Sequence, residues 1–410
     1  MGFLKAAVAL PLLLLAGTAA LPSDQAAPLE PQLSQSSTIY DAVIVGGGPA
    51  GLSALSGLAR VRRNVLLIDS GEYRNNPTRH MHDVLGYDGV TPAYYRWAAR
   101  EQLSHYETVS AINGTVTKVD VEQDNTFTVL ATHPSGEEST VCARKIVLAT
   151  GLRDILPGTP GIEENWGKGI YWCPWCDGNE HADQALGLFS DLGDAPDLVR
   201  EVTTLNSDVI AFVNGTDTAE ARAATEESFP QWEKYLALHN VTVDNRTISA
   251  LTRLANGAAS PSDPSLPTAP EYDLFRLDFT EGDPVERAAF FVSWPDEQKS
   301  DVGEAMGVQL YGGRLAADGS KGLVTNIPGV YAVGDANADN VTNVSHALYT
   351  GKRTAVYLHV QLAREEITGE LAATNGTSLT ERDYELDPRT VWETMNGGPK
   401  NILFAGDFDQ

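Results

Sequence analysis

The sequence predicts an α/β protein of two domains, and three observations support this prediction. An apolar stretch at residues 40–45 is followed by a glycine-rich turn and then by apolar residues at helical spacing. A second strand–helix–strand pattern occupies residues 185–213. The chain has 410 residues, which is enough for two domains of ordinary size. Because strands that alternate with helices are typical of parallel sheets covered by helices, we expect one such sheet in each domain.

The first twenty residues have the pattern of a secretory signal peptide. Lys5 provides a positive charge, residues 6–17 are apolar, and the small residues Thr18 and Ala20 suit a cleavage site. The apolar run is too short to span a membrane comfortably. Residues 21–37 are rich in Pro, Ser and Gln, and we expect a propeptide or a loose arm. These features predict a secreted or secretory-pathway protein.

Glycosylation sequons agree with this prediction, because N-x-S/T occurs seven times in the chain. Asn340 and Asn343 are so close that we do not expect both to carry glycans. The asparagines that we expect to be glycosylated are Asn113, Asn214, Asn240, Asn245 and Asn375.

The charge balance excludes several classes of partner. The chain carries 29 basic and 55 acidic residues, a formal net charge of −26. So acidic a surface repels nucleic-acid phosphates and anionic membranes, and we expect neither as a partner. Three cysteines are too few for a disulfide-stapled secreted scaffold.

Three glycines, Gly46, Gly48 and Gly51, stand in G-x-G-x-x-G spacing between the first strand and the first helix. Such glycines let the backbone approach a pyrophosphate at the helix N-terminus. The next strand ends in Asp69, about twenty residues further on, where a carboxylate can hydrogen-bond a ribose hydroxyl. A tight turn without a ligand is the alternative, but the context on both sides favours a dinucleotide.

A polar loop follows at residues 73–83 and contains His80 and His82 beside Asp83. Two histidines beside an acid can indicate a metal, but no third histidine stands nearby. We therefore expect no metal and a loop that packs beside the cofactor. The apolar run at residues 141–148 is strand-like, and we expect Cys142 within it to be a buried thiol.

The strongest chemical signal is the C-x-x-C motif of Cys173 and Cys176. This spacing tends to depress the pKa of one thiol and suits cycling between dithiol and disulfide. A structural zinc would need two more ligands, and a purely structural disulfide across so short a loop adds little stability. Redox chemistry is the favoured interpretation, provided that an electron carrier lies nearby.

The second strand–helix–strand pattern lacks the features of a nucleotide site. Its loop, residues 190–196, contains one glycine and the two carboxylates Asp191 and Asp194. A diphosphate would meet negative charge there, and no arginine follows the next strand to take a 2′-phosphate. Residues 256–270 are low-complexity and are expected to form an exposed loop.

Near the end of the patterned chain, a strand at residues 329–333 is followed by Gly334 and Asp335, where a carboxylate can bind a polyol hydroxyl. A helix is expected from about Ser345 to Leu362. Turn-rich residues 157–161 are a hinge candidate. The predicted boundaries are a signal peptide at 1–20, an arm at 21–37, a first cofactor-domain segment at 38–158, an inserted domain at 159–294, a second cofactor-domain segment at 295–365 and an acidic tail at 366–410.

Four motifs occur in the order seen in low-molecular-weight thioredoxin reductases: V-G-G-G-P-A-G at 45–51, A-T-G at 149–151, C-P-W-C-D-G at 173–178 and G-V-Y-A-V-G-D-A at 329–336. Over about residues 39–362 the chain resembles that family of pyridine-nucleotide-disulfide oxidoreductases. The resemblance implies a Rossmann-type FAD domain interrupted by a smaller α/β domain that carries the C-x-x-C. It also implies that Cys176 faces the flavin, that Cys173 exchanges with substrate and that Asp177 handles protons; capping of a following helix is the alternative for Asp177. The implied FAD-binding residues are Gly46, Gly48, Pro49, Ala50, Gly51, Asp69, Ala149, Thr150, Gly151, Gly334 and Asp335.

Departures from that family indicate a particular branch. The missing second glycine motif makes the chain look more like the fungal FAD-dependent dithiol oxidases, which are similar to the enzymes that close disulfides in gliotoxin or holomycin. The resemblance then implies a small-molecule or peptide dithiol substrate, oxygen as acceptor, hydrogen peroxide as product and a homodimer. An NADPH-dependent disulfide reductase and a non-catalytic flavin-binding protein are the alternatives. Members of the branch often have histidine after the second cysteine, where this chain has Asp177.

Overall fold

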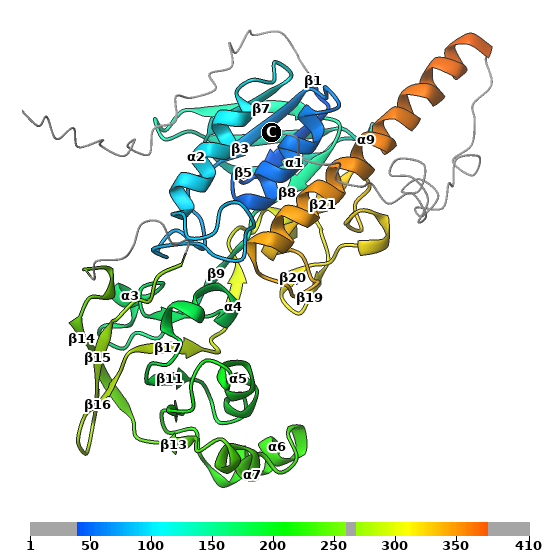
Figure 1. The fold of residues 1–410 in the computed structure, drawn as a ribbon. Coiled ribbons are helices and arrows are strands. Elements are labelled where there is room, and N and C mark those ends of the chain that lie inside the picture. The colour runs from blue at the N-terminus through cyan, green and yellow to red at the C-terminus, as the bar shows by residue number, and fades with distance from the viewer. Residues whose placement is uncertain (1–38, 260–267, 376–410) are drawn as a thin grey trace, which may run out of the picture.

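The computed structural model describes residues 39–259 and 268–375, and these form two units that lie one above the other (Figure 1). Each unit is built around a five-stranded parallel sheet. The predicted signal peptide, the arm at 21–37, residues 260–267 of the expected loop and residues 376–410 of the tail lie outside the described residues. Among the helices that are described, none is both long and apolar enough to cross a membrane.

The first unit has a central sheet in the order β21-β8-β2-β3-β4. All neighbours in this sheet are parallel, so the carboxyl ends of its strands meet at one edge. The chain starts in the middle of the sheet and moves outward in both directions, which creates a crevice beyond the end of β2. The strands are β2 (Ala42–Val45), β3 (Val65–Asp69), β4 (Val109–Asn113), β8 (Ile146–Leu148) and β21 (Val330–Ala332).

Helices cover one face of this sheet and a second sheet covers the other. The helical face carries a core that joins the three helices to the sheet, with Leu55, Leu58 and Leu358 less than 2% exposed. The other face packs on an antiparallel meander through Phe127 and Val129, which are fully buried. These elements are α1 (Pro49–Ala59), α2 (Pro92–Leu103), α9 (Val344–Asn375), β1 (Ile39–Tyr40), β5 (Thr115–Val121), β6 (Phe127–Thr132) and β7 (Glu138–Ala143).

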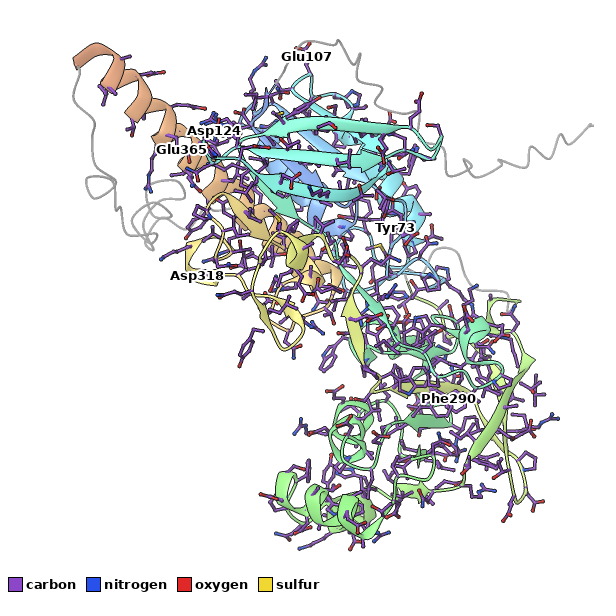
Figure 2. The ribbon with its side chains drawn as sticks, turned by 180° about the vertical axis from the view of Figure 1, so that it is seen from behind. Tyr73, Glu107, Asp124, Phe290, Asp318 and Glu365 are labelled. Atoms are coloured by element: carbon purple, nitrogen blue, oxygen red, sulfur yellow. A yellow bond between two sulfur atoms is a disulfide. The ribbon has the colours of Figure 1, made fainter. Side chains whose placement is uncertain are left out.

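The inserted unit repeats this plan with a central sheet in the order β10-β17-β11-β12-β13. Helices pack on one face, and a three-stranded antiparallel sheet packs on the other through a cluster of aromatic rings. Phe290 lies at the centre of this unit, stacked 4.4 Å from Phe189 between ring centroids (Figure 2). The elements are β10 (Ile170–Tyr171), β11 (Leu186–Phe189), β12 (Val209–Phe212), β13 (Thr242–Asp244), β17 (Ala289–Val292), α5 (Ala195–Val202), α6 (Ala219–Ser228), α7 (Trp232–Leu238), β14 (Ile248–Ala255), β15 (Leu274–Phe279) and β16 (Val285–Arg287).

The two units are joined by a pair of short strands, β9 (Leu152–Asp154) and β18 (Asp296–Gln298), which pair antiparallel. The chain therefore crosses from one unit to the other a few residues before the predicted hinge at 157–161. Short elements complete the fold: α3 (Ile162–Asn165), α4 (Pro174–Asp177), η1 (Asn179–His181), η2 (Gly257–Ala259), α8 (Val302–Ala305), β19 (Leu310–Tyr311), β20 (Arg314–Leu315), η3 (Gly319–Lys321) and η4 (Gly334–Ala336).

Two expectations about local structure are wrong. The apolar run at 141–148 is not one strand, because Arg144 and Lys145 separate β7 of the meander from β8 of the central sheet. Cys142 is exposed, since alternate side chains of β7 face outward and Cys142 is one of them.

The last helix also differs from expectation, because α9 continues to Asn375 rather than ending near Leu362. Its extension carries Glu365 and Glu366, whose carboxylates pair with basic groups on the body. Arg63 and Arg144 donate to Glu366 at 2.6 Å, and Lys145 donates to Glu365 at 2.5 Å. These ion pairs stabilise helical residues that have little apolar periodicity. The apolar pattern alone therefore predicted too short a helix.

Candidate functional site: a dinucleotide cavity with a disulfide on its wall

The glycine loop between β2 and α1 is packed tightly on one side and open on the other. Gly46 has φ +110°, a conformation that favours glycine, and a β-carbon there would overlap the carbonyl oxygen of Ala149. A β-carbon at Gly51 would overlap the carbonyl oxygen of Gly46. A β-carbon at Gly48, in contrast, would meet nothing within 4 Å. The open side of the loop at Gly48 is therefore available to a ligand.

The N-terminus of α1 is suited to an anion. Its N-cap is Gly48, which has no side chain to satisfy the free N–H groups, and Pro49 stands in the first turn. The first turn contains no acidic residue. The free N–H groups and the positive end of the helix dipole therefore face open space, as a pyrophosphate requires.

Asp69 lies at the end of β3, 2% exposed, and is more engaged than the sequence suggested. One oxygen accepts from the backbone N–H groups of Gly47 at 3.2 Å and Gly71 at 3.0 Å. The other oxygen accepts from the hydroxyl of Tyr73 at 2.5 Å and from Arg100. A ribose hydroxyl would have to share this carboxylate with those four donors, so its binding of ribose stays a prediction.

These residues border a cavity of about 810 Å³, at the large end of the usual range of about 300–1,000 Å³ for ligand pockets. Thr150 lies on its wall, and the hydroxyl oxygen of this residue is buried without a hydrogen-bond partner among the described residues. All of the predicted cofactor residues except Gly51 border the cavity: Gly46, Gly48, Pro49, Ala50, Asp69, Ala149, Thr150, Gly151, Gly334 and Asp335. Gly51 instead lets the helix approach the loop.

Cys173 and Cys176 form a disulfide at the edge of the inserted unit. Among the residues described, Cys176 lines the cavity wall and Cys173 does not. Cys173 stands at the N-cap of α4, and its sulfur accepts from the backbone N–H of Cys176 at 3.1 Å. The two sulfurs therefore have different surroundings, because Cys176 borders the cavity and Cys173 does not.

The two tryptophans beside the disulfide have separate roles. Trp172 lines the cavity, stacks on Trp166 at 5.2 Å between ring centroids and lies 5.2 Å from the guanidinium carbon of Arg74. Trp175 is 70% exposed. Trp172 therefore packs against other side chains at the cavity wall, whereas Trp175, two residues after Cys173 in the chain, is exposed.

Asp177 also lines the cavity, and its surroundings favour the neutral acid. Burial raises the pKa of Asp177 well above its usual value, and the nearby carboxylates Glu180 and Glu271 raise it further, while Arg79 partly offsets them. The helix-cap alternative is wrong, because Asp177 is the last residue of α4 rather than the residue before a helix. A buried protonated carboxyl beside Cys176 can give a proton to a thiolate and take it back.

Sequence reasoning missed Arg74, which ties the cavity to the crossing strands. Its guanidinium donates to Asp154 of β9, to Asp296 of β18 at 3.4 Å and to Asp335 at 3.1 Å. Burial raises the pKa of Asp335, and Arg74 opposes this effect. Its partners are 80 to 261 residues away in sequence, so only the fold brings them together.

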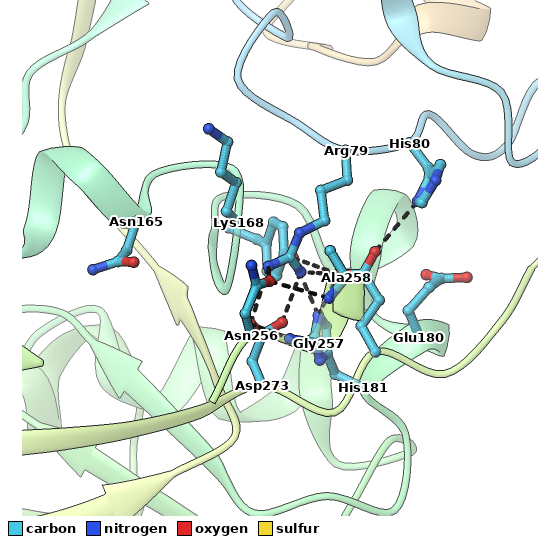
Figure 3. A network of polar contacts seen from close by, with 12 residues as sticks. Arg79, His80, Asn165, Lys168, Glu180, His181, Asn256, Gly257, Ala258 and Asp273 are labelled. Atoms are coloured by element: carbon cyan, nitrogen blue, oxygen red, sulfur yellow. Dashed lines mark hydrogen bonds and ion pairs between the residues drawn. The ribbon is translucent and has the colours of Figure 1, made fainter. Parts of the chain in front are cut away.

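A second arginine of the same loop, Arg79, crosses from the first unit onto the inserted unit (Figure 3). It donates to Glu271, to Asp273 at 2.7 Å and to Asn256 at 2.9 Å. His181, Glu271 and Asp273 lie close enough together to hold a metal ion, but Arg79 and Arg253 already pair with the two acids. The cluster is therefore an ion-pair contact between the units.

The corresponding loop of the inserted unit, between β11 and α5, carries acids instead of glycines. The N-cap of α5 is Asp194, Asp191 precedes it, and Asp197 lies in the first turn. Asp194 accepts from the hydroxyl of Ser293 at 2.9 Å. The N-terminus of α5 thus faces three carboxylates, which disfavour a diphosphate at the position where α1 is open.

Four of the five asparagines predicted to be glycosylated are exposed: Asn113, Asn214, Asn240 and Asn245. Asn375 is the last residue of α9, and its side chain lies outside the description. Asn340 is exposed and Asn343 is half-buried.

Comparison with known proteins places this geometry in a family. Residues 40–185 match the model of the pyridine nucleotide-disulphide oxidoreductases. A probable thioredoxin reductase from Arthroderma benhamiae is 44% identical over 372 residues, which cover 88% of this chain and 90% of the relative. Thioredoxin reductase aclD from Aspergillus oryzae is 29% identical, covering 80% of this chain and 98% of the relative.

Solved structures of similar proteins share the fold of this chain. The crystal structure of HlmI has a TM-score of 0.67 at 30% identity and covers 83% of this chain and 98% of its own. Thioredoxin reductase from Streptococcus pyogenes has a TM-score of 0.65 at 20% identity, covers 80% of this chain and 100% of its own, and shows the shared fold alone.

The chain belongs to the thioredoxin-reductase-like enzymes of the pyridine nucleotide-disulphide oxidoreductase family. This confirms the predicted resemblance and the predicted fold class. The family binds FAD, and the open glycine loop, the unpartnered hydroxyl of Thr150 and the cavity between them fit that cofactor. The protein is an FAD-binding oxidoreductase with a disulfide at the wall of its cofactor cavity.

Proposed function

We propose that this enzyme is a dithiol oxidase. It oxidises two thiols of a small molecule or peptide to a disulfide, transfers the electron pair to oxygen and releases hydrogen peroxide. The atoms balance, because one dithiol and one molecule of oxygen give one disulfide and one molecule of hydrogen peroxide. The observation that carries the proposal is the acidic, glycine-poor loop at residues 190–196, which disfavours NADPH in the unit where the family fold would offer a second nucleotide site.

The residues around the disulfide suggest the order of thiol exchange. A substrate thiolate attacks Cys173, which faces away from the cavity, and the bond between Cys173 and Cys176 breaks. Asp177 gives its proton to the departing thiolate of Cys176. The second substrate thiol then attacks the mixed disulfide, which releases the substrate disulfide and leaves both enzyme cysteines reduced. When bound, FAD would supply an acceptor for the electron pair that Cys173 and Cys176 release as their disulfide re-forms.

Substrate recognition is proposed to use Trp175. Trp175 is 70% exposed and stands two residues after Cys173 in the chain, and an exposed aromatic face can stack on a flat or apolar substrate. We therefore propose a compact dithiol as the substrate class.

An NADPH-dependent disulfide reductase is the second candidate, because the Arthroderma benhamiae relative is named as a probable thioredoxin reductase. The same fold and disulfide serve that reaction in the opposite direction. The acids at α5 favour the oxidase, since a reductase needs a place for the nicotinamide nucleotide.

The proposal also assigns the enzyme to the secretory pathway as a glycosylated homodimer. The signal-peptide pattern and the exposed sequons support the first two parts, and resemblance supports the third. An oxidising compartment suits an oxidase, because oxygen and thiols meet there. Endoglycosidase treatment of the secreted protein should increase its gel mobility, and an unchanged mobility contradicts the glycan assignment.

Oxygen consumption tests the proposed reaction. The purified protein should be yellow, and dithiothreitol in air should cause oxygen uptake and peroxide formation in equal amounts. Cys176→Ser should abolish both, whereas Cys142→Ser should leave both unchanged, because Cys142 lies on the exposed face of β7. Oxygen uptake that persists in Cys176→Ser would exclude the disulfide from the reaction.

A further inference from the structure

His82 stands where the redox site of the inserted unit meets the first unit. Its imidazole lines the cavity together with Cys176 and Asp177, and its side chain is 9% exposed. It belongs to the loop of the first unit that the bridge between Met81 and Val90 closes. His82 is therefore a buried titratable group on the cofactor cavity that thiol exchange itself does not use.

The imidazole lies between two carboxylates. Nε2 of His82 is 3.5 Å from Glu180 of the inserted unit, and Nδ1 is 3.4 Å from Asp88 of its own loop. Nδ1 is buried and makes no hydrogen bond to any described residue. Both separations slightly exceed a direct hydrogen bond, as is common for proton-transfer contacts in a free enzyme.

The two carboxylates lie on different sides of His82, Glu180 on the side of Asp177 and Asp88 on the side of solvent. Glu180 is 6% exposed and stands three residues after Asp177 in the chain, and its carboxylate is close enough to raise the pKa of Asp177. The carboxylate of Asp88 is 38% exposed and reaches solvent. The order Asp177, Glu180, His82, Asp88 thus runs from the wall beside Cys176 to the protein surface.

Re-forming the bond between Cys173 and Cys176 from the dithiol releases two electrons and two protons. A flavin bound in the cavity would take up the electron pair together with one of these protons, so the other proton needs a path through the protein to solvent. Resting on the proposed function, we propose that Glu180 and His82 relay protons between Asp177 and Asp88, and that this relay is complete only when the two units meet.

The charged surroundings are compatible with this assignment. Asp177 is faced by Glu180, Glu271, Arg79 and the hydroxyl of Tyr171. His82 is faced by Glu180, Asp88 and the ring of His80, 6.3 Å away between centroids. Glu180 also accepts from the hydroxyl of Thr268. Imidazole is the side chain best suited to exchange a proton between two carboxylates near neutral pH.

The imidazole of His82 reaches the cavity from the loop of the first unit. Both His82 and Glu180 act through Asp177, so they are positioning residues for proton transfer rather than groups that touch the substrate.

The test compares two variants with a control. His82→Gln and Glu180→Gln keep the shape of each side chain but cannot carry the proton, and His239→Gln removes a histidine at the end of α7, far from the cavity. The rate at which dithiothreitol reduces the holoenzyme without oxygen is measured from the flavin absorbance at a series of pH values. Both variants should be slowed by at least about tenfold with an altered pH profile, and the control should match the wild type.

Flavin-free protein separates proton transfer from structural damage. Reduction of its disulfide by dithiothreitol, counted by thiol titration, should proceed equally in the wild type and both variants, because water enters the empty cavity. Equal slowing in flavin-free protein and holoenzyme overturns the relay. Wild-type reduction rates in both holoenzyme variants overturn it as well, and a wild-type holoenzyme that dithiothreitol fails to reduce overturns the proposed function itself.

Chemical rescue gives the sharpest readout. Imidazole added to the His82→Ala holoenzyme should restore reduction, and imidazoles of increasing basicity should restore it to increasing extents, as proton transfer requires. Rescue that does not depend on basicity indicates space filling and contradicts the relay.

Discussion

The two units share one architecture but differ at one loop. Each has a five-stranded parallel sheet, with helices on one face and a second, smaller sheet on the other (Figure 1). In the first unit, α1 begins at Gly48 with no acid in its first turn. In the inserted unit, α5 begins at Asp194 with Asp197 in its first turn.

This difference shows that the same fold can be a nucleotide site or only a scaffold, depending on a few residues at a helix N-terminus. Both units are built around a five-stranded parallel sheet, but the charge at the loop that precedes the helix differs. The inserted unit contributes instead the disulfide at its edge, which it presents to the cavity of the first unit.

The largest expected effect comes from placing the same side chain in both loops. Gly48→Val should project into the cavity and lower the flavin content by at least about tenfold, because nothing but the cofactor path lies within 4 Å of a β-carbon there. Gly193→Val is the matched control, since a β-carbon at Gly193 also meets nothing within 4 Å. It should keep full flavin. The ratio of flavin absorbance to protein concentration measures the flavin content of each variant. A full flavin content in Gly48→Val would contradict the cofactor assignment.

The cysteine variants test what the inserted unit contributes. Cys173→Ser and Cys176→Ser should each abolish turnover but differ in trapping. Cys176→Ser leaves Cys173 as a free thiol, which should exchange with the disulfide form of the substrate, and mass spectrometry should detect the resulting mixed disulfide at Cys173. Cys173→Ser should give no such adduct, because Cys176 faces the cavity. The reverse pattern would overturn the assignment of the two sulfurs.

Asp177→Asn should lower turnover by about 10²–10⁴-fold, the usual contribution of a general acid or base. Burial raises the pKa of Asp177 in the folded protein, so the folded state holds the proton more tightly than the unfolded state. Stability therefore falls as the pH rises above the unfolded value, and the asparagine variant should be more thermostable than the wild type at neutral pH. The difference should vanish below about pH 4, near the unfolded pKa. A less stable variant at neutral pH contradicts this.

The smallest expected effect concerns the contact between the units. Burial alone would raise the pKa of Glu271, but His80 and Arg79 lower it to about 2. The stability from this carboxylate is therefore complete above its unfolded pKa of 4.5 and is lost as the pH falls toward 2. Thermal unfolding of Glu271→Gln should depend less on pH in this range than that of the wild type. Parallel curves for the two proteins would show that Glu271 carries no such linkage.

Local sequence patterns were sufficient for the two sheets, the glycine loop and the disulfide, because each of these depends on neighbouring residues. Contacts over long sequence distances were not predictable. Arg74 pairs with Asp335, which is 261 residues away in sequence, and Arg79 pairs with Asp273, which is 194 residues away. The exposure of Cys142 and the length of α9 were also missed, since both depend on which faces other elements cover.

The most direct test of the central claim compares two reductants without oxygen. Excess NADPH should leave the flavin absorbance of the anaerobic holoenzyme unchanged, because the acids at α5 disfavour the nucleotide. Dithiothreitol should bleach it, and readmitted oxygen should restore the absorbance with formation of hydrogen peroxide. Rapid bleaching by NADPH, with no reduction by dithiothreitol, would identify a reductase and contradict the account.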